Sequence, residues 1–181
     1  MSDTMRAYHF VGTTLRDGRP VPPDGEWLRH EGLAVICEYG LHASRHPFDA
    51  LQYAPGATLC LVDCRDIVDE RDDKLVCRER RIVARIDATG TLRQFARQCA
   101  SDVLHLWDAP KIVRQYLATG DEAIRPAASE AAWAAARDAA RDAARSAAWS
   151  AAWVTPGDDA RDAQRQRFAA LVDAAFTEVL R

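Results

Sequence analysis

The sequence predicts an α+β protein, with a small, mostly antiparallel β-domain containing one short helix over residues 1–90 and an Ala-rich helical subdomain over residues 91–181. Before residue 90, short apolar runs are interrupted by Gly and Pro, a pattern typical of strands and turns. After it, apolar residues recur at intervals of three and four, which indicates helices. Within residues 127–153, 15 of 27 positions are Ala, the residue with the strongest helix preference.

The elements of the first half follow from these apolar runs and from the residues that break them. A short helix is predicted at His46–Tyr53, because Pro47 suits a first helical turn and Pro55 with Gly56 ends it. The acidic stretch Asp66–Asp73 is expected as a solvated turn or sheet edge. Strands are expected, in chain order, at Arg6–Val11, Leu33–Tyr39, Thr58–Cys64, Lys74–Cys77 and Arg81–Ile86.

The elements of the second half follow from helix caps and breakers. Thr91 is expected to cap a first helix, and Gly120 is expected to end a second one. The block Ala127–Trp153 is predicted to be one helix. After the break at residues 156–157, Asp158 or Asp159 is expected to cap a last helix. We expect the apolar stripe of this last helix to fold back on the Ala-rich helix.

Composition and charge exclude several classes of protein. With 24 basic and 27 acidic residues the net charge is −3, whereas nucleic-acid-binding proteins usually carry a basic excess, so nucleic acid is not an expected partner. No segment approaches the roughly 18 apolar residues of a membrane span, and no signal-peptide core follows Met1. We therefore expect a cytoplasmic protein that does not contact a membrane. The five cysteines are an odd number in apolar surroundings, which favours buried thiols over disulfides.

Two pairs of residues have the types that bind metals, namely His42 with His46 and Cys60 with Cys64. On a strand, positions four apart lie about 13 Å from each other, which is too far for two ligands of one tetrahedral zinc ion. The two histidines flank a turn, so we predict no metal site. Cys37 is likewise expected to be a half-buried strand residue rather than a nucleophile. The chain also lacks the Gly-rich motifs that bind phosphate in common nucleotide-binding folds.

The most informative motifs lie between residues 7 and 53. Ala7–Phe10 has the pattern Ala-Tyr-x-Phe, Cys37–Ala43 has Cys-x-x-Gly-Leu-His-Ala, and Pro47–Tyr53 has Pro-x-Asp-x-Leu-x-Tyr. In this order the motifs resemble a domain of unknown function, number 7666, which is found mainly in phage and prophage proteins. The resemblance covers about residues 5–90 and implies no particular activity. It points to a mobile genetic element as the setting of this protein.

The same region also resembles ADP-ribosyltransferases of the poly(ADP-ribose) polymerase kind, in which a His-Gly-Thr strand and a later Gly-turn and Tyr-bearing helix bind a nicotinamide nucleotide. The matching positions are, in order, His9, Gly12, Thr13, Gly40, Leu41, His42, Ala50 and Tyr53. The resemblance implies NAD as the cofactor and places His9, His42 and Tyr53 around one cleft. Such chemistry also needs a carboxylate, for which Glu79 is the candidate. The His-Gly-Thr motif is interrupted here, and Glu79 lies in an Arg-rich strand, which leaves catalysis open.

In the helical half, every fourth position of one stretch is Trp or Arg: Trp133, Arg137, Arg141, Arg145, Trp149 and Trp153. These side chains are either packed inside the helical subdomain or exposed as a surface for a partner. They are the candidate partner-binding residues, because Trp and Arg dominate the energetics of protein interfaces. Over roughly residues 91–175, and most clearly at 98–106, the chain resembles Ala- and Trp-rich helical immunity proteins.

These observations lead to two main functional hypotheses, beside a third in which the chain is a purely structural virion or scaffolding component. The first is a non-enzymatic inhibitor from a phage or mobile element, which needs no cofactor and binds another protein, either a host defence component or a toxin. The alternative is an NAD-using, ADP-ribosyltransferase-like enzyme that acts on a macromolecule, with His9, His42, Tyr53 and Glu79 in its site. The lack of a convincing catalytic constellation favours the first. The sequence leaves the identity of the partner and the oligomeric state open.

Overall fold

The computed structural model describes the backbone of residues 4–145 and 158–181. The described residues form two compact units, which we call unit 1 and unit 2. Unit 1 consists of the residues up to Leu92 together with Arg165–Arg181, and unit 2 of the described residues between Arg93 and Gln164. None of the helices in the described ranges is both long enough and apolar enough to cross a membrane.

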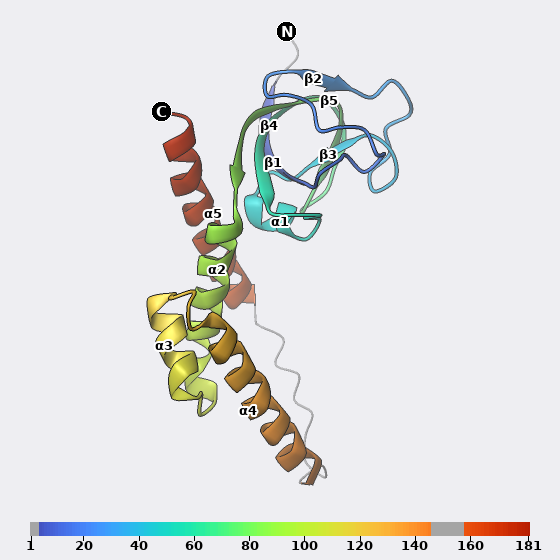
Figure 1. Cartoon of the computed structure of the whole chain (residues 1–181). Coiled ribbons are helices and arrows are strands. Elements are labelled where there is room, and N and C mark those ends of the chain that lie inside the picture. Colours follow the sequence, from blue (N-terminus) through green and yellow to red (C-terminus); the bar gives the residue numbers. More distant parts are fainter. Residues whose placement is uncertain (1–3, 146–157) are drawn as a thin grey trace. The chain divides into compact units, whose positions relative to one another are not determined.

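Unit 1 is built on an antiparallel sheet (Figure 1). Its described strands are β1 (Met5–Val11), β2 (Trp27–Arg29), β3 (Leu41–Ala43), β4 (Thr58–Glu70) and β5 (Leu75–Asp87). The order of the main path is β1-β4-β5-β2, and β3 also pairs with β5. The two long strands, β4 and β5, pair along most of their length, so they form the central hairpin of the sheet.

The sheet curls back toward its first strand. The free edge of β5 is shared, because residues 79–81 pair with β2 while residues 75–77 pair with β3. Just after β3, the backbone N–H of Ser44 donates to the carbonyl of Tyr8 at 2.9 Å, and the N–H of Tyr8 donates to the carbonyl of Ser44 at 2.8 Å. These two bonds connect the end of β3 to β1. The strands therefore surround a concave interior, visible as the ring of strands in Figure 1.

The two faces of the curled sheet have different partners. On the concave face, Ala7 and Val11 of β1 pack with Cys60, Val62 and other residues of one apolar core. On the other face, the sheet and α1 (Pro47–Leu51) contact the second half of α5 (Asp158–Val179), which belongs to unit 1. The ring centres of Tyr8 and Phe176 lie 6.4 Å apart, and those of Phe48 and Phe168 lie 6.3 Å apart. An ion pair between Arg165 and the buried Asp49 also connects this helix to α1.

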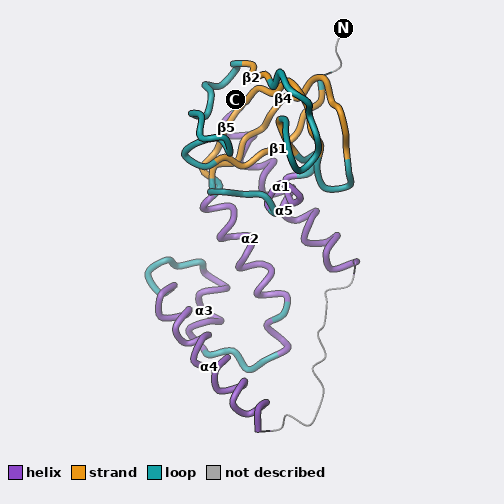
Figure 2. The backbone as a smooth tube through the Cα atoms, turned by 90° about the vertical axis from the view of Figure 1, so that its right-hand side faces the viewer, coloured by secondary structure: helices purple, strands orange, loops and turns teal. Residues whose placement is uncertain are grey.

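Unit 2 is helical in its described part. It contains most of α2 (Thr89–Asp102), a short 3-10 helix at Leu104–Leu106, α3 (Lys111–Thr119) and α4 (Arg125–Arg145). Helices α3 and α4 lie side by side (Figure 2). Gly120 ends α3 with a left-handed φ of 68°, and its N–H donates to the carbonyl of Tyr116 at 2.8 Å, as its place in the sequence predicts.

The structure confirms the α+β class, the antiparallel sheet and the short helix that begins at Pro47. The strand expected at Leu33–Tyr39 is wrong, because this segment folds into a turn in which Cys37 has a φ of 72° and the N–H of Val35 donates to the carbonyl of Tyr39 at 2.8 Å. The two strands expected at 74–77 and 81–86 are one strand, β5. Because residues 79–81 pair with β4, the charged centre of this segment is part of the strand.

Among the described residues, the apolar stripe of the last helix contacts unit 1. Phe176 of α5 lies against Tyr8, and Phe168 lies against Phe48. Residues 165–181 thus group with the β-rich part of the chain. The buried thiols expected from the sequence are found at Cys60, Cys64 and Cys77, whereas Cys37 is exposed.

Gly40 is required by the turn that precedes β3. Its φ is +111°, and a Cβ atom on it would lie 2.6 Å from Cγ2 of Val76 and 3.1 Å from Cβ of Ala34. We expect Gly40→Ala to lower the free energy of unfolding by about 2–4 kcal/mol, because backbone strain and overpacking add. Urea unfolding of the full chain measures this.

Gly18→Ala is the matched control for this substitution. Gly18 also has a positive φ, +84°, but a Cβ atom on it would have no other atom within 4 Å. Only backbone strain of about 1–2 kcal/mol is then expected. Equal losses in the two variants would contradict the packing argument.

Candidate functional site

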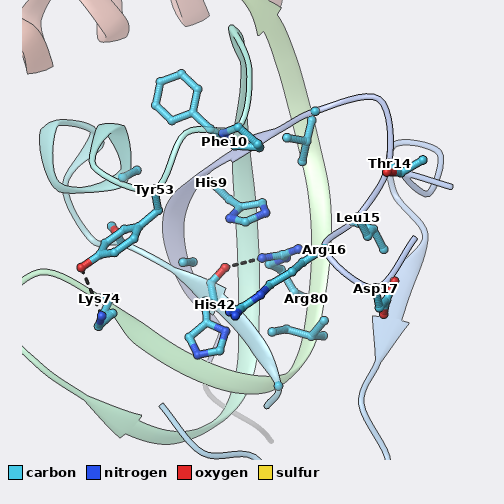
Figure 3. A pocket seen from close by; sticks show the side chains of 18 of the residues that line it. His9, Phe10, Thr14, Leu15, Arg16, Asp17, His42, Tyr53, Lys74 and Arg80 are labelled. Atoms are coloured by element: carbon cyan, nitrogen blue, oxygen red, sulfur yellow. Dashed lines mark hydrogen bonds between the residues drawn. The ribbon is translucent and has the colours of Figure 1, made fainter. Parts of the chain in front are cut away.

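A pocket of about 1200 Å³ opens into the concave side of unit 1 (Figure 3). Its walls come from β1, from the loop 12–19 that follows it, from the turn 37–40 and from β3. The end of α1 and residues 53–58 complete the rim, and β5 contributes Arg80. The pocket is therefore made by segments that are far apart in the sequence and that the curled sheet brings together.

Three of the four residues predicted to share a cleft line this pocket: His9, His42 and Tyr53. His9 alternates along β1 with Ala7 and Val11, so it points to the concave face. His42 is the middle residue of β3. Tyr53 directly follows α1, where its N–H donates to the carbonyl of Ala50 at 3.1 Å.

Glu79 does not line the pocket. It lies on β5 opposite Arg29 of β2, and its carboxylate contacts the Arg29 guanidinium at 3.3 Å. The cleft expected around four residues thus holds three of them. The carboxylates that do line the pocket are those of Asp17 and Glu38, which the sequence did not single out. Asp17 is engaged with Arg19 at 2.7 Å.

His42 organises the turn that forms one wall. Its Nε2 accepts a hydrogen bond of 3.0 Å from the backbone N–H of Cys37, and the ring also bonds the backbone of Gly40. Accepting at Nε2 requires that this nitrogen carries no proton. Burial, followed by the nearby Arg80 charge, lowers the pKa of His42 below its usual value. The imidazole is therefore neutral at pH 7 and stabilises the left-handed turn.

His9 shares this electrostatic environment. Burial is the largest cause, and the charge of Arg80 and the neighbouring His42 add to it, so that the pKa of His9 lies well below its usual value. The pocket floor therefore presents two neutral imidazoles beside one guanidinium. A neutral imidazole can donate from one nitrogen and accept at the other. His42 uses its ring nitrogens within the turn, so His9 is the imidazole that can bind polar groups of a ligand.

Arg80 is a candidate site residue that the sequence did not single out. It is only 6% exposed, and its Nη1 donates to the carbonyl of His42 (Figure 3). Its buried neighbours Cys60, Cys64 and Cys77 are thiols. In the sequence Arg80 stands within the run Arg78–Arg81, which looks like a solvated segment. The one available signal is its spacing of two from the buried Ile82, which puts both residues on the same face of a strand.

The rim of the pocket carries further positive charge. Lys74 donates to the Tyr53 hydroxyl at 3.1 Å, and its ammonium lies 4.6 Å from the centre of the Tyr53 ring. The Arg16 side chain reaches over the pocket toward His42 (Figure 3). Near Lys74, the Tyr53 hydroxyl also donates to the carboxylate of Asp73. Among the groups that line the pocket, Lys74, Arg16 and Arg80 outnumber the carboxylate of Glu38, since Asp17 and Arg19 neutralise each other. The pocket is suited to an anionic ligand.

The candidate partner-binding residues lie on or beyond α4. Trp133 is 68% exposed, and Arg137 is exposed one helical turn later. Arg141 and Arg145 belong to α4, but their side chains lie outside the described part of the structure. Trp149 and Trp153 lie outside the described residues altogether.

The pairs considered as metal ligands have other places in the fold. Cys60 and Cys64 are buried on β4, and burial raises the pKa of Cys60 to about 11. His46 is the N-cap of α1, where its Nδ1 accepts from the N–H of Phe48 at 3.4 Å. Within the described ranges, no group of three His, Cys, Asp or Glu side chains is arranged to hold a metal ion.

Comparison with known proteins gives one result for this domain. Residues 5–94 match the family model described as Domain of unknown function (DUF7666). No curated protein and no solved structure matches the chain. The N-terminal resemblance seen in the sequence is thus confirmed, and the function has to be argued from the site itself.

The lowered pKa values of His9 and His42 predict a pH dependence of stability, to which His46 adds because burial lowers its pKa too. Between the folded pKa values and the ordinary value of 6.5, the unfolded chain binds more protons than the folded one, so the free energy of unfolding falls as pH falls below about 6.5. Urea unfolding between pH 7.5 and pH 5 should show this decline. His9→Gln should make it shallower, and an unchanged slope in that variant would contradict the assignment.

Proposed function

We propose that unit 1 binds a phosphorylated nucleotide of the NAD class in this pocket. The observation that carries the proposal is that His9, His42 and Tyr53, from three separate segments, line one cationic pocket. Their order along the chain is the order in which the nicotinamide-binding motifs of ADP-ribosyltransferases occur.

The size and charge of the pocket support a ligand of this class. Small-molecule pockets commonly have volumes of about 300–1000 Å³, and about 1200 Å³ leaves room for two linked nucleotides. Arg and Lys side chains favour phosphate groups, and Arg80, Lys74 and Arg16 line the cavity. The exposed rings of Tyr39 and Tyr53 at the rim offer flat surfaces for a base.

The arrangement favours binding over group transfer. Transfer of ADP-ribose passes through an oxocarbenium-like centre, which a carboxylate beside the ribose would stabilise. Glu79 faces Arg29 outside the pocket, and Asp17 is paired with Arg19. Glu38 is exposed on the turn at the rim. We therefore propose a binding module rather than a transferase.

Calorimetric titration of the full chain with NAD tests this proposal. We expect binding, and we expect Tyr53→Ala to weaken it at least tenfold, because the ring and its contact with Lys74 form one wall. Glu79→Gln is the matched control and should bind like the wild type. Absence of binding by NAD, ADP-ribose and AMP at millimolar concentration would contradict the proposal, and so would loss of binding in Glu79→Gln.

A second candidate function is favoured by one observation in unit 2. Trp133 is 68% exposed on α4 with Arg137 beside it, and such a pair is typical of binding hot spots. We propose that this surface serves the inhibitory role expected from the sequence, with a toxin or a host defence component as the partner. The two functions are compatible, because they use different units.

Trp133→Ala separates a binding role from a structural one. Because the side chain is exposed, we expect the free energy of unfolding to change by no more than about 0.5 kcal/mol, while capture of a stoichiometric partner from host lysate is lost. Trp107→Ala, which removes another exposed tryptophan of the same unit, should still capture it. Equal capture by wild type and Trp133→Ala would rule out this surface.

A further inference from the structure

Arg80 differs from its neighbours on β5 in how its charge is balanced. Arg78, Arg81 and Arg85 each contact a carboxylate, namely Asp66 at 3.2 Å, Asp63 at 2.8 Å and Asp24. These three guanidinium groups are also partly exposed. Arg80 is 6% exposed, and no carboxylate contacts it among the residues that the structure describes. The most deeply buried cation of the strand is therefore the one without an ionic partner there.

The surroundings of Arg80 offer few acceptors. The carbonyl of His42 accepts one hydrogen bond from Nη1. Cys64 is the cross-strand neighbour of Arg80, the thiols of Cys60 and Cys77 also interact electrostatically with its charge, and thiols are weak acceptors. The thiol of Cys77 itself donates to the carbonyl of Leu41 at 3.3 Å. A guanidinium carries five N–H donors, and Arg80 lines the pocket, so its remaining donors are accessible from the cavity.

Burying a charge without a partner is strongly unfavourable. A well-packed apolar side chain at this position would avoid the penalty, since an apolar cluster covers much of the concave face. A structural role is therefore a poor explanation for an arginine at position 80. A ligand that brings negative charge into the pocket would balance it.

We propose that Arg80 is the anion-binding centre of the pocket and takes a phosphate group. The guanidinium fork matches two oxygens of a phosphate, which makes the contact bidentate and charge-assisted. His9 lies beside it as a neutral ring that can donate a further hydrogen bond. This inference rests on the proposed nucleotide-binding function for the source of the phosphate, and the site itself can be tested without a nucleotide.

The test compares Arg80→Met with wild type in buffers that contain either pyrophosphate or sodium chloride at equal ionic strength. In the wild type, millimolar pyrophosphate should raise the melting temperature by a few degrees, because it binds only the folded state. Arg80→Met should lose this rise. In phosphate-free buffer it should melt at or above the wild-type temperature, because methionine removes the buried charge without leaving a large void.

Arg78→Met is the matched control, since it removes a partly exposed arginine of the same strand that is paired with Asp66. It should keep the full pyrophosphate effect. Arg80→Lys keeps the charge but not the fork, so it should fold and show a weaker effect than wild type. Large losses of stability in both Arg80 variants in phosphate-free buffer would assign Arg80 to holding the fold, and would overturn the inference.

Titration of the same proteins with NAD and with adenosine separates this inference from the proposed function. Tighter binding of NAD than of uncharged adenosine, with at least a tenfold loss for NAD in Arg80→Met, supports both. A pyrophosphate effect that depends on Arg80 without any NAD binding supports the anion site and contradicts the nucleotide function. Equal NAD affinity in wild type and Arg80→Met overturns the anion site and leaves the nucleotide function standing.

Discussion

The antiparallel pairing of β4 with β5 is the constraint on which the rest of unit 1 depends. Two residues of β4 show this: Cys60 lies opposite His9 of β1, and Cys64 lies opposite Arg80 of β5. The same β5 strand carries β3, and with it His42, on its other edge. Because register in a half-buried sheet is fixed by which side chains face the core, the hairpin determines which polar groups meet in the concave interior. The pocket is a consequence of that register.

The interior of this sheet combines an apolar lining with a small set of polar groups. Two imidazoles are neutral because they are buried beside a guanidinium, and that guanidinium is close to thiols rather than to carboxylates. Such an arrangement lowers the stability of the folded chain, and proteins tolerate it chiefly at functional sites. The ion pairs elsewhere on the sheet, such as that of Asp63 with Arg6 and Arg81, show that carboxylates are available where a structural role needs them.

How far the sequence could predict this structure depended on whether a feature has a local cause. The helix at Pro47 and the end of α3 at Gly120 follow from residues with strong local preferences, and both were predictable. The turn at residues 33–39 was not, because Val35, Cys37 and Tyr39 alternate as in a strand. The left-handed Cys37 is bonded to the ring of His42, whose position depends on the pairing of β3 with the distant strand β5.

The site residues also divide into those with a local sequence signal and those that depend on tertiary contacts. The motif order placed His9, His42 and Tyr53 together, since each lies within or beside a short element of recognisable pattern. Arg80 escaped notice because only its tertiary surroundings distinguish it from Arg78 and Arg81. The position of Glu79 depends on pairing with β2, a short strand within a loop rich in Gly and Pro. The contact of α5 with unit 1 was not predictable either, because an apolar stripe does not say which surfaces cover it.

Binding of a nucleotide phosphate by the buried Arg80 guanidinium can be tested directly. NMR of the full chain labelled with ¹⁵N-arginine can observe the side-chain Nε–H of Arg80 directly, with Arg80→Lys used to assign its signal. Titration with ADP-ribose should shift this signal strongly and saturably, while the signals of Arg78 and Arg85 on the same strand stay near their starting positions. A nucleotide-induced shift confined to the exposed arginines, with the Arg80 signal unchanged, would contradict the account.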